Sequence, residues 1–249
     1  MSDFVELWTY LSTTPLFGLA STLALYIITS TIYKKLNQHP LANPVLWTVI
    51  VLACVLTWLD VPYQTYFSGA QFIHFLLGPA VVALAWPLWQ KRVDLMRRLP
   101  RLFLAALVGG VVSALIAVGM AWLLDLPQYL AMSLAPKSVT APVAMGLAEK
   151  MGGLPELAAI FAVLTGLIGA LLGKYIFDLI RIARDTSGWA QRGFALGTIS
   201  HGIGAARAIQ VQPTAGAFAG LALGLQVILA SLWMPVLLWV ILWLNPTWG

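Results

Sequence analysis

Lys137 lies in the segment "SLAPKSVTAP", which places a cation and several hydroxyls inside an otherwise apolar run. A charge at the centre of a membrane helix costs roughly 2.5–3.5 kcal/mol, so it needs a partner or a water-filled cavity. Pro136 and Pro142 disrupt a helix on either side, and the freed backbone groups need partners such as Ser138, Thr140 or a ligand. A cation at helix ends that face such a break is suited to binding a small carboxylate.

Two other interpretations of Lys137 are open. The lysine could mark the mouth of a loop and extend its ammonium to the lipid headgroups. Ser133 lies four residues before it, so an intramembrane Ser–Lys hydrolase is a remote alternative. Neither a nucleophile turn nor an identifiable oxyanion element accompanies the pair. We therefore expect a protein that is not an enzyme.

The second polar stretch is "GFALGTISHGIGAARA", residues 193–208, where four glycines surround Thr198, Ser200, His201 and Arg207. Glycines let a ligand or another backbone approach closely. The hydroxyls supply hydrogen bonds, and a histidine can carry a proton near neutral pH, so His201 is our candidate for proton coupling. In the alternative, a glycine-packed helix pairs its histidine and arginine with an acid such as Asp178 or Asp185. The candidate substrate-binding residues are Pro136, Lys137, Ser138, Thr140, Thr198, Ser200, His201, Gly202 and Arg207.

The segment "GAFAGLALG" repeats a glycine every four residues, at Gly216, Gly220 and Gly224. Small residues at this spacing let membrane helices approach closely. We expect these glycines to form a helix-packing face, and they make a homodimer a reasonable expectation.

Composition defines the class of protein that holds these residues. The 249 residues are 60% hydrophobic and 9% charged, with a mean hydropathy of +0.88. Soluble domains carry roughly 25% charged residues, so we expect an integral membrane protein in contact with the lipid bilayer. Cys54 is the one cysteine, which excludes an internal disulfide and a cysteine-based metal site. We expect no cofactor and no metal. We also expect no nucleic-acid partner, because the basic residues behind the net charge of +5 collect in loops between apolar spans.

The predicted fold class is an all-α membrane protein, a polytopic helical bundle that forms a single domain over 1–249. A spanning helix needs about 20 mostly apolar residues. Two weaker stretches, 128–150 and 190–210, are rich in glycine, proline and hydroxyls and are expected to be broken or re-entrant. The "MSDFVELWTY" start does not resemble a cleaved signal peptide. The predicted full spans are 16–33, 44–59, 70–89, 102–124, 157–180 and 216–244.

Basic residues orient these spans. The positive-inside rule places the loops 34–43 and 90–101 in the cytoplasm and Asp60 and Asp125 outside. Arg181 should again be inside, which requires that 128–150 enters from the outside and returns to the same side. By the same count, 190–210 enters and returns on the cytoplasmic side.

An internal repeat supports a transporter plan. The segment "LLGPAVVAL", residues 76–84, aligns with "SLAPKSVTA" on Pro79 and Pro136, and Ala80 then stands where the second copy has Lys137. Secondary transporters often repeat a broken helix and hold their substrate at the breaks. Whether the repeat is inverted or parallel stays open.

Two long blocks resemble the LrgB/CidB membrane protein family, which includes bacterial YohK-like proteins and the C-terminal half of the plant plastidial glycolate/glycerate translocator. They are "LAPKSVTAPVAMGLAEKMGGLPELAAIFAVLTGLIGALLG" and "RGFALGTISHGIGAARAIQ…GAFAGLALGL". "NPVLW", "YQTYFSG" and "LLGPAVVALAWPLW" also fit, so the resemblance covers nearly the whole chain. Thr140–Ala141 stands where the family usually has two threonines, which leaves Thr140 as the hydroxyl ligand.

The resemblance implies two functions. One is transport of a small monocarboxylate such as pyruvate, glycolate, glycerate or lactate, in a multi-pass protein of the bacterial inner membrane. The other is an antiholin-like modulator of murein hydrolase activity and lysis that acts with a small LrgA/CidA-type partner. The residues favour proton-linked transport, because a modulator has no need for a lysine in a broken membrane helix.

Overall fold

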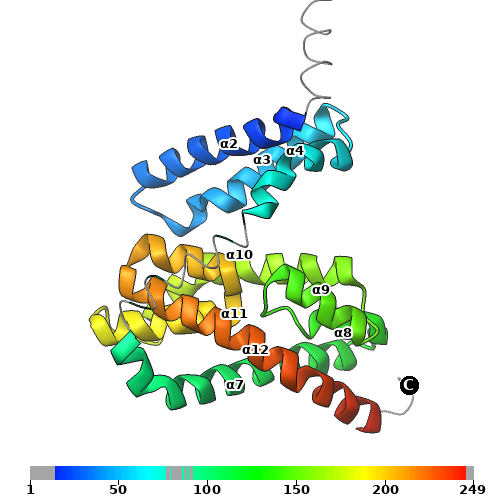
Figure 1. Cartoon of the computed structure of the whole chain (residues 1–249), viewed down its shortest axis with the longest axis vertical. Helices are drawn as coiled ribbons and strands as arrows, with labels where there is room; N and C mark the ends of the chain where they lie inside the picture. The colour runs from blue at the N-terminus through cyan, green and yellow to red at the C-terminus, as the bar shows by residue number, and fades with distance from the viewer. Residues whose placement is uncertain (1–14, 77–78, 80–85, 87–88, 90–91, 245–249) are drawn as a thin grey trace, which may run out of the picture. The chain divides into compact units, whose positions relative to one another are not determined.

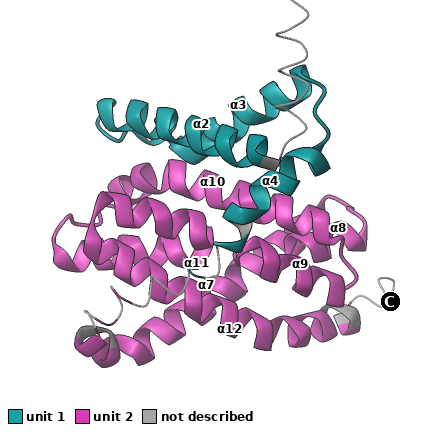
Figure 2. Ribbon diagram, turned by 45° about the horizontal axis from the view of Figure 1, so that its top comes forward, with its two compact units in different colours: residues 1–83 teal, residues 84–249 magenta. Residues whose placement is uncertain are grey.

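The computed structural model describes residues 15–244 apart from 77–78, 80–85, 87–88 and 90–91, and in these residues the regular elements are all helices. The chain divides into two compact units, residues 1–83 and 84–249, coloured separately in Figure 2. Both candidate polar stretches belong to the second unit. Because the regular elements of the described residues are all helices, the all-α class is confirmed.

The first unit packs three helices and one short turn of 3₁₀ helix. Asn43 caps one of these helices, because its Oδ1 accepts hydrogen bonds from the backbone N–H of Val45 (2.9 Å) and of Leu46 (3.2 Å). The buried hydroxyls of Thr29 and Thr48 lie 2.8 Å apart and join two helices. The elements are α2 (Pro15–Lys35), η1 (Pro40–Ala42), α3 (Pro44–Trp58) and α4 (Tyr63–Phe75).

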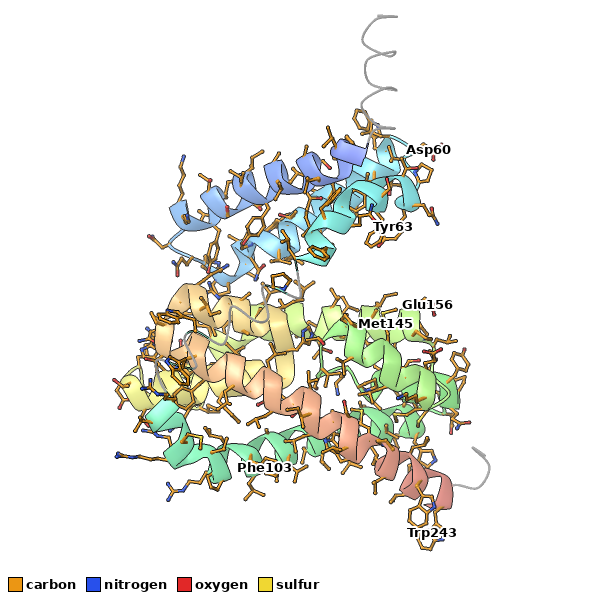
Figure 3. All side chains as sticks on the ribbon, viewed as in Figure 1. Asp60, Tyr63, Phe103, Met145, Glu156 and Trp243 are labelled. Carbon is orange, nitrogen blue, oxygen red and sulfur yellow. The ribbon has the colours of Figure 1, made fainter. Side chains whose placement is uncertain are left out.

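The second unit contains long apolar helices interrupted by short ones (Figure 1). Its outer faces carry exposed large side chains such as Phe103 and Trp243, 45% and 71% exposed, which point away from the helices in Figure 3. Extended apolar exposure of this kind is typical of a surface that faces lipid. The elements are α7 (Arg92–Leu123), α8 (Gln128–Leu134), α9 (Ala141–Lys150), α10 (Pro155–Leu179), α11 (Thr186–Val211) and α12 (Pro213–Leu244).

The described residues contain four helices long and apolar enough to cross a membrane. They are Leu16–Lys35, Met96–Leu123, Pro155–Leu179 and Pro213–Val240. They correspond to four of the six predicted spans. The predicted span 44–59 is the apolar but shorter helix α3. Half of the predicted span 70–89 lies outside the described residues, as does most of the first copy of the proposed repeat.

The stretch 128–150 is broken, as predicted. Helix α8 ends at Leu134, a turn follows, and α9 begins at Ala141 with Pro142 in its first turn. Proline is tolerated there because the first N–H groups of a helix have no intrahelical acceptor. After α9 the chain returns to α8, where the Ser133 hydroxyl accepts a hydrogen bond from the N–H of Leu154 at 2.8 Å. The segment therefore doubles back on itself.

The stretch 190–210 is broken as well, at His201 in α11. His201 has φ 40° and ψ −132°, a conformation that residues other than glycine seldom adopt. A Cβ on Gly204 would lie 2.6 Å from the carbonyl oxygen of Leu196, eight residues earlier. In a straight helix eight residues rise about 12 Å, so the second half of α11 folds back on the first.

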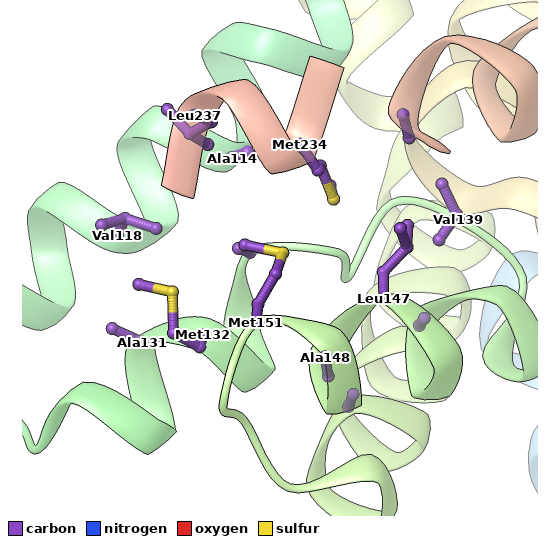
Figure 4. Close-up of a cluster of buried hydrophobic side chains, with 14 of the residues drawn as sticks. Ala114, Val118, Ala131, Met132, Val139, Leu147, Ala148, Met151, Met234 and Leu237 are labelled. Atoms are coloured by element: carbon purple, nitrogen blue, oxygen red, sulfur yellow. The ribbon is translucent and has the colours of Figure 1, made fainter. Parts of the chain in front are cut away.

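Alanine and methionine side chains form the core around the first break (Figure 4). Val139 of the break is fully buried and packs in one cluster with Ala114 of α7, Ala162 of α10 and Ala230 of α12. Because small residues dominate this cluster, the helices approach closely. The core thus fixes the break against three long helices.

We expect Gly197→Ala to lower the melting temperature in detergent, since its Cβ would lie 2.2 Å from the backbone carbonyl oxygen of Ala219 in α12. Overpacking against backbone costs about 1–3 kcal/mol. Gly119→Ala is the matched control, because nothing lies within 4 Å of its Cβ position. Thermal unfolding of both variants measures the difference. Equal melting temperatures would contradict the close contact of α11 with α12.

Candidate functional site

Lys137 binds a serine of helix α7. Its Nζ donates to the carbonyl oxygen of Ser113 at 2.7 Å and contacts the Ser113 Oγ at 3.1 Å. The hydroxyl of Ser138, which is buried, lies 2.8 Å from the same Oγ. An ammonium has three donors, so one N–H of Lys137 remains for a ligand. Ser113 was not predicted; the only signal was a lone hydroxyl in the apolar span 102–124.

The charge of Lys137 has no acidic partner among the described residues, where its ammonium contacts the carbonyl and the hydroxyl of Ser113. The lysine is half-buried in the turn between α8 and α9. A desolvated cation whose only partners are neutral oxygens favours the approach of an anion. Lys137 is therefore suited to hold a carboxylate.

The remaining candidates of the first break shape its backbone. Pro136 is buried, and its carbonyl oxygen accepts a hydrogen bond from the Val139 N–H at 3.1 Å. Thr140 stands at the N-cap position of α9, where its hydroxyl makes no capping hydrogen bond. The N-terminal end of α9 and the Thr140 hydroxyl therefore accompany Lys137 at the break.

His201 contacts helix α10 from the second break. Its Nε2 lies 2.7 Å from the carbonyl oxygen of Ala162, and because a carbonyl only accepts, Nε2 must carry a proton. The ring lies against Gly166, where a Cβ would be 2.9 Å from Nε2. Gly202 follows at the kink, with nothing within 4 Å of its Cβ position. The buried imidazole thus bridges α11 and α10.

The other candidates of α11 are buried in different ways. Thr198 donates its hydroxyl to the carbonyl of Phe194 at 2.9 Å, within its own helix. Ser200 is 1% exposed and its Oγ occupies the space that a Cβ on Gly169 would take. Arg207 is 8% exposed, in the second half of α11. A ligand could reach the Thr198 hydroxyl through its lone pairs.

Helix α7 brings the two breaks together. A Cβ on Gly109 of α7 would lie 3.3 Å from the methyl group of Thr198. Ser113 of the same helix binds Lys137. Residues four apart share one face of a helix, one turn from each other. Ala162 makes a second link, since it contacts His201 through its carbonyl and shares a core cluster with Val139. Both predicted polar stretches therefore contact the same parts of α7 and α10.

The acids proposed as alternative partners of His201 are engaged elsewhere. Asp178 lies 2.8 Å from both Arg184 and Arg192. Asp185 caps α11 by accepting a hydrogen bond from the N–H of Gly188 at 2.7 Å. The imidazole consequently faces the Ala162 carbonyl instead of a carboxylate.

The predicted glycine face of α12 lies partly inside the chain. Gly216 packs against Ile209 of α11, and Gly220 is buried. Gly224 is exposed, with nothing within 4 Å of its Cβ position. The first two glycines are thus occupied by the chain's own packing, and Gly224 is the member of this face open to a second copy.

We expect Ser133→Ala to destabilise the break without abolishing ligand binding. The buried Ser133 hydroxyl donates to the Tyr129 carbonyl at 2.6 Å and accepts from Leu154 N–H at 2.8 Å, so its loss removes two hydrogen bonds, each worth about 0.5–1.5 kcal/mol. Thermal melting should fall relative to Ser231→Ala, which removes an exposed hydroxyl. Covalent labelling of Ser133 by a fluorophosphonate would instead support the hydrolase alternative.

Comparisons with known proteins agree on one family. The model of the LrgB-like family matches residues 22–240. The uncharacterized protein YxaC of Bacillus subtilis (strain 168) is 33% identical over 222 residues, 88% of this chain and 93% of that protein. The holin-like protein CidB of Staphylococcus epidermidis is 31% identical over 217 residues, 87% of this chain and 93% of that protein. No solved structure matches the chain. With its apolar helices and a match over most of its length, this multi-pass membrane protein belongs to the LrgB-like family.

Proposed function

We propose that the protein is a secondary transporter of small monocarboxylates of the 2-oxo or 2-hydroxy class. The observation that carries the proposal is the half-buried Lys137, held by the neutral Ser113 at a helix break and without an acidic partner among the described residues. A substrate carboxylate would supply the missing countercharge. Broken helices that meet at one place are the usual substrate site of secondary transporters.

The roles of the other residues follow from their positions. Ser138 and Thr140 lie beside Lys137 and would donate hydrogen bonds to the substrate, as would Ser200 at the other break. The Thr198 hydroxyl donates within its own helix and would line the site. His201 would exchange a proton during the transport cycle, because an imidazole titrates near neutral pH. Arg207 would orient the site or pair with the substrate. The site requires no cofactor, and we place the protein in the bacterial inner membrane.

A second function is favoured by one relative. CidB of Staphylococcus epidermidis is named a holin-like protein, which supports the alternative of an antiholin-like modulator of murein hydrolase activity and lysis. Such a protein would act with a small LrgA/CidA-type membrane partner. Disturbed carboxylate and proton balance would connect the two functions, since transport failure alone could alter lysis.

Counterflow into proteoliposomes tests the transport proposal. Vesicles loaded with unlabelled pyruvate, lactate or glycolate should transiently accumulate the labelled acid above its equilibrium level, which a carrier achieves and an open pore does not. Protein-free vesicles give the background. Absence of flux for all three acids, with or without a purified LrgA/CidA-type partner, would contradict transport and favour the lysis modulator.

A further inference from the structure

Gln226 of α12 has a buried polar side chain. It lies outside both predicted polar stretches, and the proposed function gives it no role. It is 1% exposed in a strongly apolar helix. Its Oε1 is buried and accepts no hydrogen bond from the residues that the structure describes. A buried acceptor without a donor costs about 1–3 kcal/mol, and a water or a ligand that donates to it would remove this cost.

Helix α7 holds this amide beside the lysine site. A Cβ on Gly110 would lie 2.0 Å from the Nε2 and 2.9 Å from the Oε1 of Gln226, so the amide rests directly on the α7 backbone. Ser113, the partner of Lys137, lies three residues further along the same helix face. Residues three apart on a helix have Cβ atoms about 5–6 Å apart.

The core packing confirms the same neighbourhood independently. Ala230 lies one turn after Gln226 on α12 and belongs to the cluster that contains Val139 of the break and Ala114 of α7. The amide is therefore one helical turn from residues packed against the Lys137 turn. Lys137 and the Gln226 amide thus contact α7 at positions three residues apart, Ser113 and Gly110.

We infer that Gln226 is the specificity-determining residue of the proposed carboxylate site and selects acids that carry a hydroxyl on the carbon next to the carboxylate. The inference rests on the proposed transport function. Lys137 holds the carboxylate, and the 2-hydroxyl donates to the unpartnered Oε1. A 2-oxo acid offers only an acceptor at this position, and an unsubstituted acid offers nothing, so both leave the Oε1 unpaired.

Three acids of equal carbon number separate this role from general binding: lactate has a 2-hydroxyl, pyruvate a 2-oxo group, and propionate neither. In proteoliposomes, wild-type protein should take up lactate with a half-saturating concentration about tenfold or more below that of propionate. Gln226→Leu should remove this preference while propionate uptake stays within about threefold of wild type.

Gly110→Ala provides a second variant that keeps the glutamine. Its new methyl group must displace the flexible amide end of Gln226, so it should reduce the lactate preference without deleting a polar group. Gly119→Ala, at an open position of the same helix, should leave the preference unchanged. Should Gln226→Leu fail to fold, Gly110→Ala decides the question.

The outcomes separate the two proposals. A lactate preference that persists in both variants, or a parallel loss of all three acids, would overturn the selective role and make Gln226 a structural or water-binding residue. If wild-type protein shows no counterflow of pyruvate, lactate or glycolate, the transport proposal falls and the selective role falls with it.

Discussion

Lys137→Met should lower carboxylate uptake by about a hundredfold or more, because removing one member of a buried charge pair costs about 3–5 kcal/mol and each 1.4 kcal/mol is a factor of ten. Methionine keeps the length and the apolar stem of lysine, so packing at the break is preserved. The loss should be the same for lactate, pyruvate and propionate, since all three share the carboxylate. Initial uptake rates in proteoliposomes measure it.

The stability of the same variant should change in the opposite direction. Without substrate, the ammonium is half-buried and has only the neutral Ser113 as a partner, so its removal should leave the melting temperature unchanged or raise it. Lys174→Met removes an exposed cation from α10 and should affect neither quantity. Uptake that survives in Lys137→Met, or falls equally in Lys174→Met, would contradict the assignment of the site.

The sequence was sufficient to predict the helical membrane class and the two breaks. These features leave local signals: Pro136 and Pro142 flank a charge, and glycines surround His201. Crossing counts then predicted that each stretch turns back, and the contacts of Ser133 with Leu154 agree with this for the first stretch. Local composition thus identified where regular helix must end.

The residues that complete the site could not be predicted in the same way. Ser113 and Gln226 are isolated polar residues in the apolar parts of long helices. The same pattern occurs where a polar side chain only forms a hydrogen bond with the backbone of its own helix. Only tertiary contacts distinguish them. Ser113 accepts a hydrogen bond from Lys137, which lies 24 residues further along the chain, and the amide of Gln226 packs against Gly110. The comparison of Ala80 with Lys137 stays a prediction, because residue 80 lies outside the described residues.

His201 combines two costs that packing alone does not explain. Its φ of 40° lies in a region that costs about 1–3 kcal/mol for a residue with a Cβ, and its imidazole is 4% exposed. A glycine would adopt this backbone freely, as Gly202 beside it could. We therefore expect the imidazole itself to have a role at this position. Its contact with the Ala162 carbonyl is consistent with proton coupling and also with a purely structural role.

His201→Gln separates these two roles, and we expect it to lower uptake driven by a proton gradient by about tenfold or more while counterflow exchange stays within about threefold of wild type. A glutamine amide can donate to the Ala162 carbonyl from nearly the position of Nε2, so the bridge between α11 and α10 is preserved. It cannot take up a proton in this pH range, so coupling is lost. Uptake with and without an imposed pH gradient measures the ratio.

His201→Leu is the companion variant, because it removes both the proton and the donor. It leaves the Ala162 carbonyl without its hydrogen bond inside the core, so it should lower the melting temperature as well as the gradient-driven uptake. If His201→Gln keeps its response to the gradient while His201→Leu loses stability, the imidazole only braces the kink. Proton coupling would then have to come from another group of the transport cycle, and the buried histidine would be a structural bridge between two broken helices.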